Sequence, residues 1–270
     1  MLFLQGRFVE TSDFQRSYEA LASSYDNEWY VHLDKVTTDV VAELAQIQPQ
    51  CILDAGCGTG SSTFKLRGTF SDSYIAGLDF SPSMLAEAKK KFSKDRALLV
   101  RDSLENGIKR FSNNQFDLVT CFWSLGYAKN KAVYKQLNRI LADKGYLFIL
   151  TNKRNTLKEV RQSMKYTMFQ HIDMIDKVPL HKFPKDKQHL LDMLGSNYEE
   201  IKYGEGSFSI NLADKKNMLD WILNTGILAG YEYILDLRKN KPCRDTFVKY
   251  FNDNFSELTH NYMWLLVQKK

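Results

Sequence analysis

A glycine-rich loop flanked by carboxylates is the part of the sequence best equipped for chemistry. The stretch Cys51–Gly60 reads CILDAGCGTG, a short apolar run that ends in Asp54 and continues as glycines alternating with small residues. Ser61 then begins a helical pattern, so the stretch predicts a buried strand, a tight turn and a helix start. Glycine suits such a turn because it tolerates unusual dihedral angles and leaves backbone N–H groups open to a ligand. We therefore expect an adenosine-bearing cofactor here.

Two further carboxylates stand at the ends of the next predicted strands. Residues 74–79 form a short apolar run that ends in Asp79, and residues 97–100 lead in the same way to Asp102. In open α/β sheets, ligands bind outside the carboxyl ends of the strands, so we expect Asp54, Asp79 and Asp102 to converge there on one nucleoside. A carboxylate at the position of Asp79 can accept hydrogen bonds from both ribose hydroxyls.

The spacing of the glycines separates two classes of cofactor. Gly56, Gly58 and Gly60 form G-x-G-x-G, whereas the dinucleotide fingerprint is G-x-G-x-x-G. With the acid before it, the loop resembles the first motif of the class I, Rossmann-like methyltransferases that use S-adenosylmethionine. The segments YEALASSYD at 18–26 and DFSPSML at 79–85 resemble two further motifs of that family. The main resemblance covers roughly residues 18–150.

This resemblance implies S-adenosyl-L-methionine as cofactor, S-adenosyl-L-homocysteine as product and a small molecule as methyl acceptor. It also implies that residues 18–26 fold over the cofactor, with Tyr25 nearest to the methionine end or the transferred methyl, and that Asp102 accepts from the adenine amino group. The cofactor-binding residues are then Tyr25, Asp54, Ala55, Gly56, Gly58, Asp79, Phe80, Met84, Asp102, Ser103 and Phe122. No catalytic residue is assigned, and the candidates for the acceptor pocket are Tyr25, Trp29, Tyr127 and His171, the last as a general base.

The sequence gives fewer indications of the methyl acceptor than of the cofactor. After the predicted strand 116–122, the chain lacks the Asn/Asp-Pro-Pro-aromatic motif with which enzymes of this class hold base or amide nitrogens. That departure disfavours DNA adenine, many RNA substrates and glutamine. The run MLDWILNTG at 218–226 resembles a segment of trans-aconitate methyltransferases, which esterify small polycarboxylates. We therefore expect transfer to an oxygen or nitrogen of a small metabolite, with a carboxylate as one option that needs no general base.

Strands alternate with helices from 51 to 150, which predicts an α/β fold with a doubly wound, mostly parallel seven-stranded sheet covered by helices on both faces. The expected segments of this one domain are an N-terminal helical cap (1–47), a cofactor-binding core (48–152), a lid-like insertion (153–197) and a C-terminal completion of the sheet (198–270). The elements expected in the last segment are strands at 198–203 and 207–212, helices at about 214–224, 227–237 and 243–257, and a closing strand at 262–267.

The composition fits a soluble globular protein, since 44% of the 270 residues are hydrophobic and 26% are charged. The net charge of +5 suits an anionic small substrate, but it forms no basic stripe of the kind that binds nucleic acid. No apolar run is long enough to span a membrane, and the opening MLFL is too short for a secretory signal. The four scattered cysteines favour reduced thiols in the cytoplasm, and no His or Cys spacing predicts a metal site.

Two alternative functions remain open at this point. The chain could be a non-catalytic module that binds S-adenosylmethionine or S-adenosylhomocysteine, which intact cofactor motifs beside a sealed substrate cavity would favour. It could also be an RNA-modifying methyltransferase, which a continuous basic stripe leading to the cofactor would favour. For the assembly, the sequence leaves a monomer and a homodimer equally open.

Overall fold

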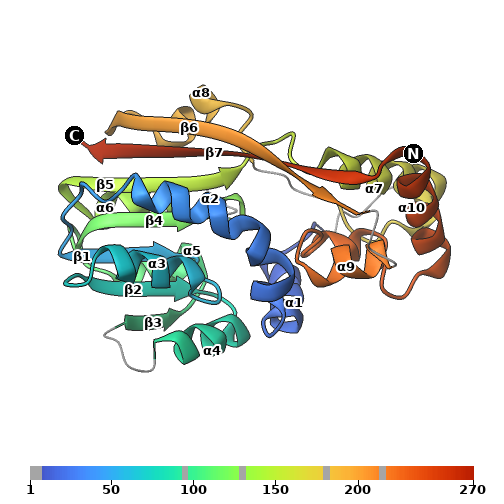
Figure 1. Ribbon diagram of the computed structural model, residues 1–270, viewed down its shortest axis with the longest axis horizontal. Coiled ribbons are helices and arrows are strands. Elements are labelled where there is room, and N and C mark those ends of the chain that lie inside the picture. The colour runs from blue at the N-terminus through green and yellow to red at the C-terminus, as the bar shows by residue number, and fades with distance from the viewer. Residues whose placement is uncertain (1–7, 93–96, 128–131, 179–182, 213–216) are drawn as a thin grey trace.

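The computed structural model describes residues 8–92, 97–127, 132–178, 183–212 and 217–270. A seven-stranded sheet in the order β3-β2-β1-β4-β5-β7-β6 runs through the molecule (Figure 1). The strands β1 to β5 pair in parallel, whereas β7 is antiparallel to both β5 and β6. The predicted α/β fold with a mostly parallel seven-stranded sheet is confirmed. The strands are β1 Cys51–Ala55, β2 Tyr74–Asp79, β3 Ala97–Arg101, β4 Phe116–Phe122, β5 Leu141–Asn152, β6 Tyr198–Asn211 and β7 Glu257–Lys269.

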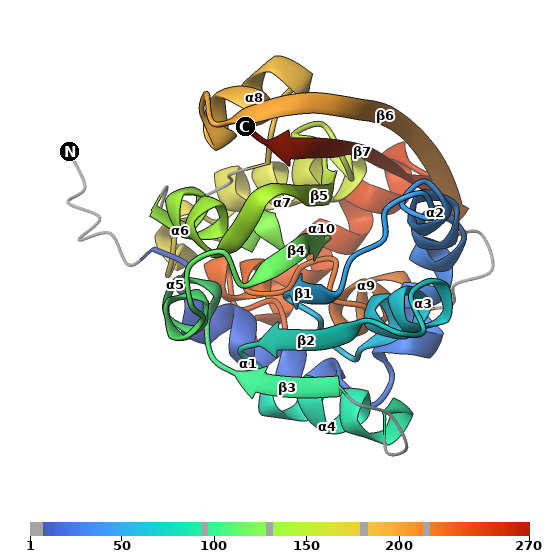
Figure 2. The same cartoon turned by 90° about the vertical axis from the view of Figure 1, so that its left-hand side faces the viewer.

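Helices cover both faces of the sheet (Figure 2). The α-helices are α1 Thr11–Leu21, α2 Val31–Ala42, α3 Ser61–Thr69, α4 Pro82–Lys91, α5 Leu104–Gly107, α6 Ala132–Ile140, α7 Lys158–Gln170, α8 Lys187–Leu194, α9 Met218–Asn224 and α10 Lys241–Asn254. In β5, Phe148 and Leu150 pack with α2 and α3, whereas Leu147 and Ile149 pack with α6 and α8. Successive side chains of a strand point to opposite faces, so a strand covered on both sides is apolar throughout.

Local sequence fixes the helix starts at the carboxyl edge of the sheet. The Ser81 hydroxyl accepts a hydrogen bond from the Met84 N–H at 3.3 Å, and Pro82 occupies the first helical position of α4. The Ser103 hydroxyl caps α5 in the same way by accepting from the Asn106 N–H at 3.3 Å. Both caps satisfy N–H groups that the helix leaves unpaired, and they place the helix starts directly after the strand ends.

Strands β6 and β7 form a ribbon that extends past the carboxyl edge of the other strands (Figure 1). They pair as far as Asn211 with Glu257, whereas β5 reaches only to the partner of Tyr262. The prediction of separate strands at 198–203 and 207–212 is wrong, because β6 is continuous. Gly204 and Gly206 make no turn there. Instead they lie under the rings of Trp264 and Tyr262 of β7, where an added Cβ would come within 2.5 Å of ring or hydroxyl atoms.

A helical layer of α1, α7, α9 and α10 lies beyond the carboxyl edge, beside the extended ribbon (Figure 1). Its apolar side chains share one core cluster with the ends of β6 and β7. The helix expected at 227–237 is wrong, because this segment folds as turns and a short 3-10 helix, Tyr231–Ile234. Gly226, Gly230 and Asp236 all have positive φ angles (83°, 76° and 42°), which a continuous α-helix excludes.

All four cysteine thiols are free. Within the described ranges, no helix is long and apolar enough to cross a membrane. The same residues contain no group of three or more His, Cys, Asp or Glu side chains placed to hold a metal ion.

Candidate functional site

The glycine loop between β1 and α3 adopts the left-handed conformations that its sequence predicts. The φ angles of Gly56, Gly58 and Gly60 are +85°, +53° and +78°. Only Gly58 borders open space, since nothing lies within 4 Å of the Cβ that another residue would add there. A Cβ on Gly56 would collide with the side chain of Ser124, and one on Gly60 would lie 2.8 Å from the ring of Phe92. The outer two glycines thus permit close packing, and the middle one exposes backbone to a ligand.

The loop, the ends of β2, β3 and β4 and part of the N-terminal cap line a cavity of about 920 Å³, part of it open to solvent, which we call the loop cavity. Most of the residues predicted to bind the cofactor line it. These are Tyr25, Gly56, Gly58, Asp79, Phe80, Met84, Asp102, Ser103 and Phe122. Asp54 and Ala55 do not line the loop cavity and lie fully buried at the end of β1.

Asp54 supports the loop from within the core. Its carboxylate accepts hydrogen bonds from the hydroxyls of Ser62 at 3.0 Å, Thr63 at 2.6 Å and Thr120 at 3.0 Å. Burial raises the pKa of Asp54, and these three hydroxyls act against that rise. Asp79 and Asp102 both line the loop cavity, whereas Asp54 ties β1 to the first turn of α3 and to β4. That these carboxylates bind a nucleoside stays a prediction.

Asp79 lies in the wall of the loop cavity at the end of β2. Its two carboxylate oxygens accept from the backbone N–H of Gly58 at 2.9 Å and of Ser81 at 2.8 Å. Burial raises the pKa of Asp79 to about 6, with a smaller contribution from the charge of Asp54. Each oxygen can accept more than one bond, so donors from a bound ligand would stabilise the charged form.

Asp102 reaches the same cavity from the end of β3. One of its oxygens accepts from the Ser103 N–H at 2.9 Å, and the other lies 2.5 Å from a guanidinium nitrogen of Arg110. The loop cavity therefore combines two fixed carboxylates, exposed glycine backbone at Gly58 and apolar side chains such as Phe80. This combination fits an adenosyl group, whose sugar offers hydroxyl donors and whose base offers a flat apolar face.

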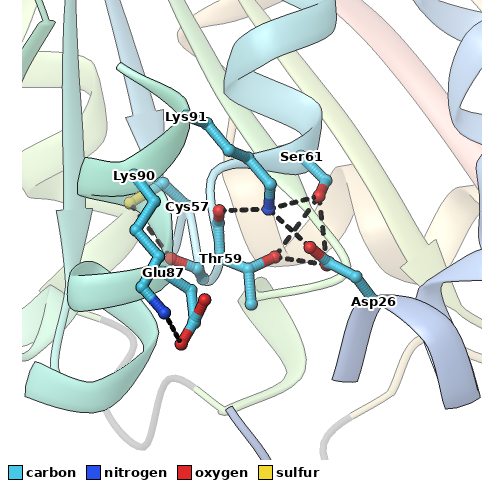
Figure 3. Close-up of polar contacts among 8 residues, drawn as sticks. Asp26, Cys57, Thr59, Ser61, Glu87, Lys90 and Lys91 are labelled. Atoms are coloured by element: carbon cyan, nitrogen blue, oxygen red, sulfur yellow. Dashed lines mark hydrogen bonds and ion pairs between the residues drawn. The ribbon is translucent and has the colours of Figure 1, made fainter. Parts of the chain in front are cut away.

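A polar cluster connects the cap to the glycine loop and to the end of α4 (Figure 3). The Asp26 carboxylate accepts from the Thr59 hydroxyl at 2.6 Å and the Ser61 hydroxyl at 3.0 Å. The Lys91 ammonium lies 2.5 Å from Asp26 and also donates to the Thr59 carbonyl at 2.6 Å. We call these four residues the cap clamp. No sequence signal pointed to its Lys91, which reads as an ordinary cation at a helix end.

A second cavity, the aromatic cavity, adjoins the loop cavity. It measures about 1430 Å³, part of it open to solvent, and Tyr18, Tyr25 and Trp123 line both cavities. Trp123 follows β4 with a φ of 58°, a strained conformation for a bulky residue. Its backbone N–H donates to the Leu150 carbonyl at 2.7 Å and its indole N–H donates to the Thr37 hydroxyl at 3.3 Å. The structure thus fixes this ring in the common wall.

The aromatic cavity is positively charged. Arg154, Arg161 and Lys165 line it, and none of its described lining residues is acidic. No ion pair joins these cations to any carboxylate in the part of the chain that the structure describes. Burial lowers the pKa of Arg161, which nevertheless stays charged because an arginine titrates far above neutral pH. An anionic ligand suits this cavity.

Of the predicted acceptor-pocket residues, Tyr25 and Trp29 line the aromatic cavity. Tyr127 ends a 3-10 helix at Leu125–Tyr127, and its side chain lies outside the part of the chain that the structure describes. His171 lies at the end of α7, where its Nε2 is 2.7 Å from the Thr246 hydroxyl, outside both cavities. The structure therefore gives no support to His171 as a general base. Sequence reasoning missed Asn152, Arg161 and His260, which belong to no motif and are brought together only by the fold.

Comparison with known proteins agrees with this geometry. A family described as "Methyltransferase domain" matches residues 52–145. The malonyl-[acyl-carrier protein] O-methyltransferase of Herminiimonas arsenicoxydans is 28% identical over 81% of this chain and 78% of its own length. The trans-aconitate 2-methyltransferase of Klebsiella pneumoniae is 26% identical over 72% of this chain and 75% of its own length.

A solved structure shows the same fold. The geranyl diphosphate C-methyltransferase of Streptomyces coelicolor, determined with S-adenosyl-L-homocysteine, superposes with a TM-score of 0.53 at 13% identity, covering 88% of this chain and 80% of that one. The matched domain and the named relatives identify this chain as a methyltransferase that uses S-adenosyl-L-methionine, of class I, and the solved structure agrees with them in fold.

Proposed function

We propose that this methyltransferase esterifies a carboxylate oxygen of a small anionic acceptor bound in the aromatic cavity. One observation carries the proposal: a cavity lined by Arg154, Arg161 and Lys165, without an acidic residue among its described walls, shares its wall with the loop cavity. The names of the two relatives support it, since one acts on malonyl-[acyl-carrier protein] as an O-methyltransferase and the other on trans-aconitate.

We propose one orientation for the cofactor in the loop cavity, on the basis of the residues that line it. Asp79 would accept hydrogen bonds from the ribose hydroxyls, and Asp102 and Ser103 would contact the adenine. Phe80 and Met84 would pack against the base. Tyr25 lines both cavities and would face the methionine end. S-adenosylmethionine, when bound, supplies a methyl group activated by its sulfonium.

The protein's own contribution is positioning and the exclusion of water. An acceptor carboxylate is already deprotonated at neutral pH, so the site needs no general base. The cations of the aromatic cavity would attract the acceptor, and its apolar walls would leave little water around the reacting oxygen. Charge is neutralised when a carboxylate attacks a sulfonium methyl, so a dry site favours the transition state.

The cap (1–47) and the insertion (153–197) would act together as the cover of this site. The Lys177 ammonium lies 2.5 and 2.6 Å from the two carboxylate oxygens of buried Asp13, and the Val9 N–H donates to the Val178 carbonyl at 3.1 Å. The two segments would therefore move as one unit when an acceptor enters. We retain a cytoplasmic monomer or homodimer as the expected state of the protein.

The test is methyl transfer from isotopically labelled S-adenosylmethionine to a metabolite extract. We expect one or a few acidic metabolites to gain a labelled methyl group that mild alkaline hydrolysis removes, as it removes an ester. A product whose methyl resists alkali would contradict a carboxylate acceptor. Cofactor binding by calorimetry without any labelled product would instead support the non-catalytic binding module.

A further inference from the structure

Three buried side-chain atoms of residues that line the aromatic cavity have no hydrogen-bond partner in the described part of the chain. One is Arg161 Nε, which belongs to the cations of this cavity, and the other two belong to neutral side chains. Asn152 Oδ1 and His260 Nδ1 are buried, and neither atom bonds to any residue that the structure describes. Both residues line the aromatic cavity. Buried polar side-chain atoms nearly always find a partner, because a buried group without a hydrogen bond destabilises the fold. The cavity therefore offers unsatisfied polar atoms at which a polar ligand can bind.

The two side chains face the same side of the sheet. Asn152 ends β5 and pairs with Tyr262 of β7, so His260 lies diagonally across from it. Diagonal neighbours of an antiparallel pair stand about 7–8 Å apart at their α-carbons. A small polar group placed between them can reach both side chains.

Aromatic rings hold the imidazole of His260 in place. Phe208 stacks on it with ring centroids 4.8 Å apart, and the edges of Trp29 and Trp123 approach at 5.6 and 5.3 Å. His260 is only 1% exposed, so its ring has little freedom to find another partner. Since Trp123 also lines the loop cavity, His260 lies next to the wall through which the methyl must pass.

Charge distinguishes this pair from the cations of the same cavity. An ion pair with Arg161 or Lys165 would draw electron density from a carboxylate oxygen and make it a poorer nucleophile. Burial lowers the pKa of His260 to about 3, so its imidazole is neutral at physiological pH and adds no positive charge near a sulfonium. Neutral hydrogen bonds can orient a reacting carboxylate with a smaller loss of nucleophilicity.

We propose that Asn152 and His260 hold the reacting carboxylate of the acceptor by hydrogen bonds, while Arg154, Arg161 and Lys165 hold a second acidic group. The acceptor class is then a molecule with at least two acidic groups, of which one is esterified. The imidazole can donate from Nδ1. The Asn152 amide can donate from Nδ2, which takes the place of the orphaned Oδ1 when the amide turns by about 180°. This inference rests on the proposed function, and it makes Asn152 and His260 positioning residues.

The test compares His260→Phe, His260→Gln and Asn152→Leu with wild type, using the extract fraction that accepts the labelled methyl. We expect His260→Phe and Asn152→Leu to lower kcat about tenfold or more while the KM for the acceptor changes little, because the cations still bind it. His260→Gln should recover part of the loss, since its amide restores an N–H. His189→Phe, at a histidine outside both cavities, should keep the wild-type kcat.

Cofactor affinity and thermal stability separate positioning from folding. Calorimetric affinity for S-adenosylmethionine should stay within about twofold of wild type in His260→Phe, which preserves the ring packing. A kcat within twofold of wild type in that variant would overturn the proposal. So would equal losses in His260→Phe and His260→Gln accompanied by lowered thermal stability.

The product decides the acceptor class. Mass spectrometry of the methyl ester should find at least one acidic group remaining, and a product without one would overturn the two-acid requirement. If wild type binds the cofactor yet methylates nothing in the extract, the proposed function itself fails and this inference fails with it. Active wild type with an unaffected His260→Phe variant would remove only the inference.

Discussion

The loop cavity and the aromatic cavity are built in opposite ways. The loop cavity is formed mainly by one stretch of chain, in which Gly56, Asp79, Asp102 and Phe122 occupy the ends of neighbouring strands. The aromatic cavity draws its walls from the cap, α7, the turns after α9 and the ribbon. Backbone geometry shapes the first cavity, whereas packing between distant segments shapes the second. A cofactor common to many enzymes suits a fixed backbone frame, and an acceptor particular to one enzyme suits walls that can vary.

The sharpest test of the backbone frame is a substitution at the one glycine of the loop that faces open space. Gly58→Val should reduce S-adenosylmethionine affinity by more than about 100-fold, because the β-branched residue is strained at a φ of +53° and its side chain would enter the loop cavity. Calorimetric titration measures the loss. Gly68→Ala is the matched control, since it lies in α3 with nothing within 4 Å of an added Cβ, and it should bind normally. If Gly58→Val binds S-adenosylmethionine as tightly as wild type, the glycine loop is not part of the cofactor site.

Asp79→Asn tests the carboxylate of the loop cavity that we propose binds the ribose hydroxyls of the cofactor. We expect cofactor affinity to fall by about 1.5–3 kcal/mol, or about 10- to 150-fold, because charge-assisted hydrogen bonds are replaced by neutral ones. The raised pKa of about 6 adds a pH signature. Wild-type affinity should be constant above pH 7 and fall below pH 6 as the carboxyl is protonated, whereas the Asp79→Asn variant should show no such fall. Calorimetric titrations at several pH values measure both effects. If the affinity of the two proteins changes with pH in the same way, Asp79 does not bind the cofactor through its charged carboxylate.

The same shift predicts how the stability of the cofactor-free protein depends on pH. The folded protein binds the Asp79 proton more tightly than the unfolded chain does, since burial raises the pKa from 3.8 to about 6. The free energy of unfolding should therefore decrease as pH rises through this window, by up to about 3 kcal/mol from this group. Asp79→Asn should lack that component. Urea denaturation of both proteins between pH 4 and 7 measures it, and identical slopes would contradict a buried, desolvated Asp79.

The sequence predicted the loop cavity because its determinants are local. Gly58 is recognised by the glycines that alternate around it, and the cap Ser81 is recognised by Pro82 directly after it, so each signal lies within a few residues of its own position. Asp54 was predicted among the cofactor-binding residues, but a strand-end acid can also point into the core, as Asp54 does where Thr63 and Thr120 donate to it. Motif spacing does not distinguish these two orientations.

The aromatic cavity could not be predicted in the same way. Whether Arg161 or His260 lines a cavity depends on how α7 packs beside the extended ribbon, and that packing involves residues almost 100 positions apart. The prediction of two strands in place of β6 failed for the same reason. Gly204 and Gly206 suggest a turn in the sequence, whereas in the structure the rings of Trp264 and Tyr262 cover them. A cross-strand contact of this kind leaves no periodic signal in a single sequence.

Arg161→Gln tests the aromatic cavity, because Arg161 lines that cavity and not the loop cavity. We expect the KM for the acceptor to rise about tenfold, because one of three cations that would hold the anion is lost, and affinity for S-adenosylmethionine to remain at the wild-type value. Steady-state kinetics with the accepting extract fraction and calorimetry measure the two quantities. Lys158→Gln, at an exposed position of the same helix outside both cavities, is the control. If both variants raise the KM for the acceptor equally, Arg161 acts only through the overall positive charge of the protein and does not bind the acceptor directly.

The cap clamp gives the smallest effect and tests whether the two cavities are coupled. The side chains of Lys91 and Asp26 are 28% and 34% exposed, so solvent screens their attraction and the pair contributes about 0.2–1 kcal/mol. Asp26→Asn should therefore speed cofactor dissociation by about two- to fivefold, and high salt should bring wild type closer to the variant. Stopped-flow release of S-adenosylhomocysteine measures this rate. Lys90→Gln, which breaks only the exposed pair with Glu87 beside the clamp (Figure 3), should release the product at the wild-type rate. If Asp26→Asn also raises the KM for the acceptor, the cap positions both ligands. The loop cavity and the aromatic cavity would then be coupled through Tyr25, which lines both.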